Sequence, residues 1–270
     1  MAEFHGTVLD LEKLLEDDKS VTLVLKFFQM SPRRLLRRII TFNLIVIVMA
    51  ILLGLLKSGN PSRYFGEGRF TTFCSATQLL AIAGLSWLIF IRRHRPATLE
   101  PNGAPWFRRV HCVWLLMAVG FVFLAADELF ELHERMDRFI IRGLDLPRTP
   151  LTDRLDDAIM ASYGLIGLAV LWLSRRELIS FQRVMRGPMI AGFICLFLGL
   201  LCDTASNDDA FFHWLTGDLP LAKKLNGWFS AFEGALTLLP EGLFTAAFYA
   251  AWITDPARGF EKDANPWDIR

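Results

Sequence analysis

The segment AFEGALTLLPEGLFTAAFYAAWI, residues 231–253, is long and apolar enough to cross a lipid bilayer as a helix. A hydrocarbon core about 30 Å thick requires about 20 predominantly apolar residues. Glu241 stands near the middle of the segment, which contains no basic residue. A carboxylate at that depth is costly unless it is paired, protonated or bound to a metal. We therefore expect Glu241 to have a partner on another helix, and Pro240 before it to bend this one.

Similar apolar runs recur along the chain, in which 53% of the residues are hydrophobic. The six predicted membrane spans are residues 39–56, 72–91, 110–129, 157–173, 189–203 and 232–253. The fifth is the shortest and could extend through Thr204 and Ala205. The sequence thus predicts an all-α polytopic membrane bundle of about six transmembrane helices over residues 39–253.

The two flanking segments are predicted to lie outside the bilayer. Residues 1–38 form a cytoplasmic or interfacial segment, in which residues 8–28 could make an amphipathic helix, and residues 254–270 form a cytoplasmic tail. Lys and Arg are modestly more frequent on the flanks that share a side with both termini, which predicts that both termini are cytoplasmic. The formal net charge of +1 leaves no basic face for nucleic acid.

Acidic side chains gather where the third span ends, in the sequence ADELFELHERMDRF over residues 126–139. If one helix continues through this sequence, Asp127, Glu131 and Glu134 share a face, whereas Glu128 and His133 point away from it. These residues could serve as ligands together with other helices. In the alternative interpretation, Glu131 and Glu134 pair with Arg135 and Arg138, four residues further on, as a solvated surface.

A second acidic sequence, DTASNDDAFFHW over residues 203–214, follows the fifth span. Asp203 continues an apolar run and is the least easily explained as a turn residue. The other acids could simply cap the helix and form a turn, and His213 could be an interfacial anchor as readily as a ligand. Glu233 lies two helical turns from Glu241 in the sixth span.

Carboxylates and imidazoles from several spans match the ligand types used for divalent metals. We therefore predict a bound Zn, Mn, Fe or Ca ion, with Glu134 and Glu241 as catalytic proton carriers. The sequence lacks the helical pairs of a di-iron bundle and the motif of a zinc protease. The predicted metal ligands are Asp127, Glu128, Glu131, His133, Glu134, Asp203, His213, Glu233 and Glu241.

The string DELFELHE, residues 127–134, resembles a motif of uncharacterised bacterial multi-pass membrane proteins that reads Asp-Glu, four residues, His-Glu. The matching positions are Asp127, Glu128, His133 and Glu134, and the resemblance implies a bacterial inner-membrane location. A more distant similarity is to ceramidase-like membrane hydrolases, whose sites look like zinc held by several histidines. This chain has five histidines in all and does not meet the three-histidine pattern.

Three functions follow from these patterns. The first is a metal-dependent hydrolase acting on a lipid or lipid-linked substrate that enters from the bilayer. The second is a transporter or channel that moves protons or cations along Glu241, Glu233 and Asp203. The third is a non-catalytic subunit of a larger membrane complex, in which these acids pair with a partner's arginines; an oligomer is compatible with all three.

Overall fold

The computed structural model describes residues 30–66, 68–93, 111–145, 147, 149, 155–179, 181–206 and 209–254. In these residues the regular structure is entirely helical. The predicted amphipathic helix over residues 8–28 and the predicted tail from residue 255 onward lie outside the described residues. Asp208 also lies outside them.

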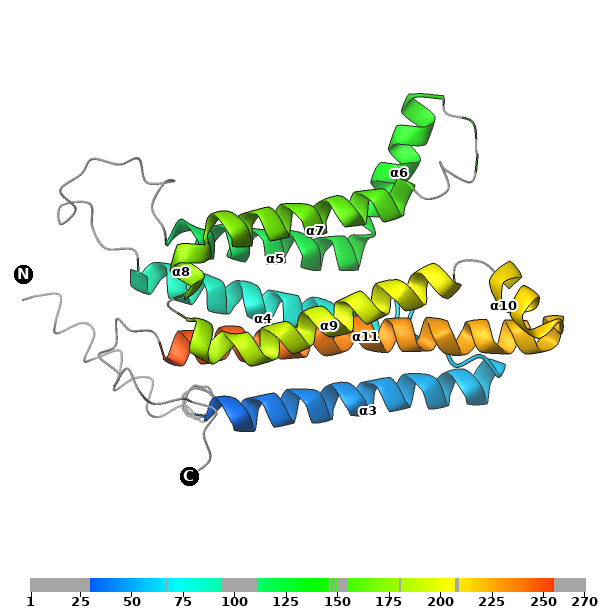
Figure 1. Cartoon of the computed structure of the whole chain (residues 1–270), viewed down its shortest axis with the longest axis horizontal. Coiled ribbons are helices and arrows are strands. Elements are labelled where there is room, and N and C mark those ends of the chain that lie inside the picture. The colour runs from blue at the N-terminus through cyan, green and yellow to red at the C-terminus, as the bar shows by residue number, and fades with distance from the viewer. Residues whose placement is uncertain are drawn as a thin grey trace, which may run out of the picture.

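The long helices run side by side and form one elongated bundle (Figure 1). We call one end of the bundle the α6 end, because α6 lies there. The same end holds the ends of α3, α5 and α9 and the starts of α4, α7 and α11. The opposite end, where α8, the start of α3 and the end of α11 lie, is called the α8 end (Figure 1). The helices are α3 (Pro32–Ser58), α4 (Phe70–Arg93), α5 (Cys112–Phe130), α6 (Leu132–Gly143), α7 (Leu155–Leu173), α8 (Arg175–Ile179), α9 (Gln182–Ser206), α10 (Asp209–Thr216) and α11 (Leu219–Ile253).

In the described residues, five helices are long and apolar enough to cross a membrane, namely α3, α4, α5, α9 and α11. The remaining predicted span, the fourth (residues 157–173), is α7, whose apolar part, Ala158–Leu173, is shorter but runs along the bundle with the others (Figure 1). Large apolar side chains are exposed along α3, α5, α7 and α9, as expected for helices that face lipid. The prediction of an all-α membrane bundle is confirmed.

The central helix of the bundle is α11, which packs most extensively against α9 and also against α4 and α3. Glycines permit these close approaches, as is common between membrane helices. A Cβ on Gly192 would overlap the ring of Phe244, and one on Gly242 would lie 2.7 Å from Nδ2 of Asn43. The sequence stretch that most clearly predicts the fold is therefore also its most buried helix.

At the α6 end, helix α11 begins earlier than the sequence predicts. Helix α11 begins at Leu219 rather than near residue 232. Helix α10 packs against its early turns, where the ring centroids of Phe212 and Phe229 lie 4.9 Å apart. Helix α11 also continues through Pro240, since neighbouring helices support a proline in a packed membrane helix. The expected extension of the fifth span past Thr204 is confirmed, because α9 ends at Ser206.

The prediction of one continuous helix through residues 126–139 is wrong. Helix α5 ends at Phe130, Glu131 adopts a left-handed conformation with φ of 53°, and α6 begins at Leu132. Asp127 explains the break, because its carboxylate Oδ1 accepts a hydrogen bond of 2.7 Å from the backbone N–H of His133 and so caps α6. As a result α6 turns across the bundle axis instead of prolonging α5 (Figure 1).

Candidate functional site

Glu241 is buried within the bundle, with only 7% of its surface exposed. Its Oε1 atom accepts a hydrogen bond of 2.5 Å from the hydroxyl of Ser75 on α4. Among the described residues, its Oε2 atom is buried and has no hydrogen-bond partner. The expected partner on another helix is therefore present, but it is a neutral hydroxyl rather than a cation.

The same serine connects Glu241 to a second carboxyl group. Glu128, half-buried on the last turn of α5, makes a side-chain hydrogen bond with Ser75. Glu128 and Glu241 also interact electrostatically with each other. We call Glu128 and Glu241 the carboxyl pair; three helices, α4, α5 and α11, bring the pair and its serine together.

An amide pair lies beside the carboxyl pair and fixes α3 and α4 against α11. The side chain of Asn43 donates to Oε1 of Gln78 at 3.0 Å, and the side chain of Gln78 donates to Oδ1 of Asn43 at 3.1 Å. Asn43 also donates to the backbone carbonyl of Leu238 at 2.9 Å. Since buried amides without partners are costly, this network specifies how α3, α4 and α11 fit together near Glu241.

Asp127 and His133 lie at the junction of α5 and α6, next to Glu128. Besides capping α6, Asp127 contacts the ring of His133 through Oδ2, which lies 3.0 Å from Nδ1. Asp127 is buried, whereas His133 is partly exposed. Both interact electrostatically with Glu128. Two residues of the quoted motif, Asp127 and His133, thus lie next to the more exposed member of the carboxyl pair.

The other predicted ligands lie elsewhere. Glu134 is on the surface of α6, where it pairs with Arg138 at 2.6 Å, and Glu131 occupies the bend itself. His213 is exposed on α10. The remaining two predicted ligands, Asp203 and Glu233, sit on α9 and α11. The packing of Gly199 against Leu236 and of Gly192 against Phe244 sets the register of these helices and brings Asp203 to the level of Glu233, two turns from Glu241.

The predicted ligands therefore do not converge on a single centre. In the part of the chain that the structure describes, no group of three or more His, Cys, Asp or Glu side chains is arranged to hold a metal ion. The metal centre stays a prediction that this geometry does not support. What the geometry brings together is the carboxyl pair, Ser75 and the Asp127–His133 contact.

The half of the bundle toward the α8 end is packed with aromatic side chains. Trp114 makes edge-to-face contacts with Phe181 and Phe248, and Phe121 makes another with Phe248. Trp114, Phe181 and Phe248 are fully buried. Such packing leaves no polar route from Glu241 toward the α8 end through these residues.

A charged cluster closes the α8 end. Glu177 on α8 is 6% exposed and pairs with Arg93 on α4, whose Nε atom lies 2.6 Å from Oε1 of the glutamate. Arg93 also donates to Oε2 at 3.1 Å, and the indole N–H of Trp114 donates to Oε1 at 3.0 Å. We call Arg93, Glu177 and Trp114 the ion-pair clamp, since it joins α4, α5 and α8.

Several of these residues were missed by the sequence analysis. Ser75, Asn43 and Gln78 are polar residues within predominantly apolar runs, and that was a usable signal, because a polar side chain in a membrane helix needs a partner. Glu177 follows two arginines, a pattern typical of a solvated connection between helices. No sequence pattern indicates that it is buried.

Long apolar helices that enclose a buried carboxyl pair define this molecule as a polytopic α-helical membrane protein. The family model described as Domain of unknown function (DUF8692) matches residues 40–254, which include the whole bundle from the start of α3's apolar run to the end of α11. The chain belongs to this family. Comparisons with curated proteins and with solved structures gave no match.

Proposed function

We propose that this membrane protein carries protons through the carboxyl pair, as a proton-conducting or proton-coupled transporter. The observation that supports the proposal is the position of Ser75, hydrogen-bonded to both Glu128 and Glu241, with Oε2 of Glu241 buried and unpartnered among the described residues. Ionisable residues inside membrane bundles commonly mark proton relays.

The bridging serine makes a proton relay chemically straightforward. A hydroxyl can donate one hydrogen bond while accepting another. A protonated Glu128 would donate to the serine oxygen while the serine donates to Glu241. Transfer along this chain moves the proton of Glu128 to Ser75 and the proton of Ser75 to Glu241, so Glu128 becomes ionised and Glu241 neutral. Since two carboxylates that interact in a largely apolar setting repel each other, one shared proton is the favoured state of the pair.

Access to the relay is asymmetric, which suits alternating access. Asp127, His133 and the half-buried Glu128 form a polar path from the α6 end, whereas the aromatic packing around Trp114 and Phe248 separates Glu241 from the α8 end. A proton that reaches Glu241 therefore needs a rearrangement of the aromatic half before it can leave on that side. We expect the ion-pair clamp to hold that half closed until the rearrangement occurs.

The proposal is tested with protein in liposomes loaded with a pH-sensitive dye under an imposed membrane potential. The wild type should carry protons, and Glu241→Gln and Ser75→Ala should each reduce the flux about tenfold. Ser75→Thr keeps a hydroxyl and should retain most of the proton flux. The matched control is Glu134→Gln, which makes the same change in an exposed ion pair and should behave as the wild type.

A second measurement does not depend on a transported substrate. In infrared difference spectra across a pH step, the C=O stretch of a protonated carboxylic acid should be present in the wild type and in Glu134→Gln, and should be altered in Glu241→Gln. Unchanged spectra in Glu241→Gln, together with flux that is the same in all variants, would overturn the proposal.

The remaining predictions are retained as such. The hydrolase lacks a supporting ligand set among the described residues, and elemental analysis of the purified protein tests its metal directly. The accessory-subunit function is tested by whether a stable partner co-purifies. The resemblance to the bacterial motif proteins and the inner-membrane location with cytoplasmic termini also stay predictions. If the termini are cytoplasmic, the relay opens outward.

A further inference from the structure

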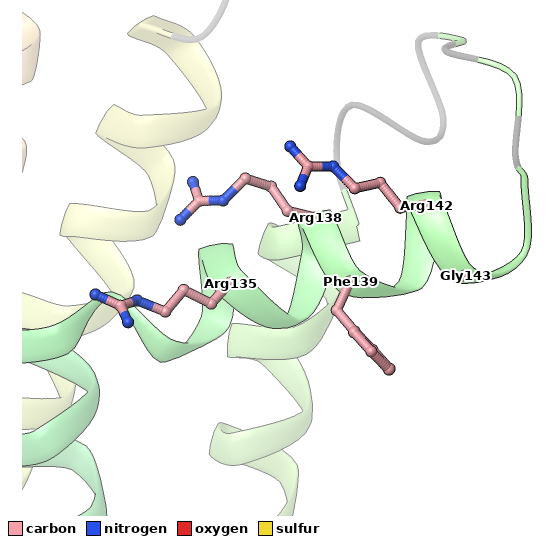
Figure 2. A pocket seen from close by; sticks show the side chains of 5 residues that line it. All are labelled: Arg135, Arg138, Phe139, Arg142 and Gly143. Atoms are coloured by element: carbon pink, nitrogen blue, oxygen red, sulfur yellow. The ribbon is translucent and has the colours of Figure 1, made fainter.

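Helix α6 combines a basic face with an exposed apolar face, outside the site described above. Arg135, Arg138 and Arg142 are spaced three and four residues apart, so they lie on one side of the helix. Together with Phe139 and Gly143 they line a pocket with a volume of about 460 Å³. Figure 2 shows the three guanidinium groups extending to one side and Phe139 pointing away from them.

The charges on this face are only partly compensated. Arg138 pairs with Glu134, and among the described side chains Arg135 and Arg142 have no carboxylate partner. Guanidinium groups favour phosphate, which they bind with two parallel hydrogen bonds. The pocket therefore presents at least two cations with unused donors to an anion that approaches from the α6 end.

The apolar side of α6 indicates where that anion comes from. On α6, Phe139 is 77% exposed and Met136, three residues earlier, is 44% exposed, and such apolar surface is unfavourable in water. Helix α6 turns across the bundle axis beside α7 (Figure 1), and the exposed apolar surface of the bundle requires lipid, so this orientation would lay α6 along the membrane surface. Helices with basic and apolar faces bind at such interfaces.

We propose that α6 is a binding site for an anionic phospholipid. The phosphodiester occupies the pocket formed by Arg135, Arg138 and Arg142, while Phe139 inserts among the acyl chains. The phosphate of a zwitterionic lipid already has its own cation, so phosphatidylglycerol is preferred over phosphatidylcholine. The site is independent of the proton relay, since no member of the carboxyl pair contributes to it.

Hydrogen exchange of full-length protein in detergent gives a local measurement. Added phosphatidylglycerol should slow the exchange of backbone amides in residues 132–144 at least threefold, and phosphatidylcholine should have little effect. The triple variant Arg135→Gln, Arg138→Gln, Arg142→Gln should lose this protection. The matched control, Arg33→Gln, Arg34→Gln, Arg37→Gln at the other end of the bundle, should keep it.

Two further measurements separate the outcomes. Unchanged hydrogen exchange in α11 shows that a variant is folded. If the triple variant is unstable, the single variant Arg142→Gln replaces it and should halve the protection or reduce it further. Phe139→Ser should weaken the effect of phosphatidylglycerol. The proposal is overturned if both lipids protect equally, if inorganic phosphate alone reproduces the protection, or if the arginine variants retain it.

Discussion

Glu177 and Glu241 are two glutamates of nearly equal burial, 6% and 7% exposed, one at the α8 end of the bundle and the other in its interior. Both oxygens of Glu177 receive N–H groups, from Arg93 and Trp114. Glu241 receives one serine hydroxyl and, among the described residues, has an oxygen with no donor. Burial alone therefore does not determine the role of a carboxyl group. The hydrogen-bond donors that contact the group determine it.

The difference separates a structural carboxylate from one able to exchange a proton. A carboxylate beside a guanidinium is held in its ionised form, and losing it leaves a buried or half-buried cation uncompensated. A carboxyl group without a cation in an apolar setting is more easily neutralised by a proton. The same substitution, Glu to Gln, should consequently destabilise the protein strongly at Glu177 and hardly at all at Glu241.

Glu177→Gln should have the largest effect on stability. The substitution removes the charge that compensates Arg93 and one of the acceptors in the ion-pair clamp, at a cost of about 2–4 kcal/mol of unfolding free energy. The expected loss of stability lies in the lower part of the range for breaking buried ion pairs, because the Arg93 side chain is 21% exposed and can reach water. Unfolding by SDS, followed by circular dichroism, measures the loss.

The double variant Arg93→Gln, Glu177→Gln tests the cause of that loss. It removes both charges, so we expect it to be more stable than Glu177→Gln alone. A double variant as unstable as the sum of the two single variants would mean that the charges do not interact and that the clamp is only a packing contact.

Asn43→Ala should have the next largest effect, about 1–2 kcal/mol. It removes the partner of Gln78 and the donor to the carbonyl of Leu238, at a position that is fully buried in the bundle. The same SDS titration checks this value. Thr77→Ala, which alters an exposed hydroxyl bonded within its own helix, provides the control and should change stability far less.

Much of this fold could be predicted from the sequence, whereas the site could be predicted only in part. Apolar runs identify membrane helices because bilayer thickness imposes their length, and Glu241 was conspicuous because its run contains no basic residue. The break at Glu131 was not predictable from helical periodicity, since it depends on Asp127 reaching the backbone of His133. Periodicity describes one continuous helix and cannot indicate where a side chain ends it.

The pairing of residues that are distant in the chain could not be predicted from the sequence either. That Ser75 meets Glu241, or that Glu177 meets Arg93, depends on how helices are packed and on their register. Nothing in the local sequence of RREL distinguishes a buried Glu177 from a solvated one. A single sequence reports which residues need partners, but the packing determines which partners they obtain.

Asp127→Ala should cost about 1 kcal/mol, because it removes the cap of α6. Asp127→Asn keeps an oxygen that can accept the bond from the backbone N–H of His133 and should cost less. Hydrogen exchange of the amides at the start of α6 distinguishes the two variants, with faster exchange expected in the alanine variant. Equal exchange in both would indicate that the cap contributes little to the bend.

Glu134→Gln should change stability by less than about 0.5 kcal/mol, because its pair with Arg138 is partly exposed. Added salt should reduce even this small effect, since screening weakens surface ion pairs. SDS titrations at low and high salt make the comparison. A loss close to that of Glu177→Gln would show that this pair is more than a surface contact.

Glu241→Gln should have the smallest effect on stability, within about 0.5 kcal/mol of the wild type. The amide oxygen can still accept the hydrogen bond from Ser75, and the amide nitrogen takes the place of an oxygen that has no donor among the described residues. A neutral side chain of the same shape thus resembles the protonated glutamate. If Glu241→Gln instead unfolds as readily as Glu177→Gln, a buried cation must accompany Glu241, and the contrast between the two glutamates would fail. Near-native stability together with lost proton flux would establish that Glu241 is retained for its proton rather than for the fold.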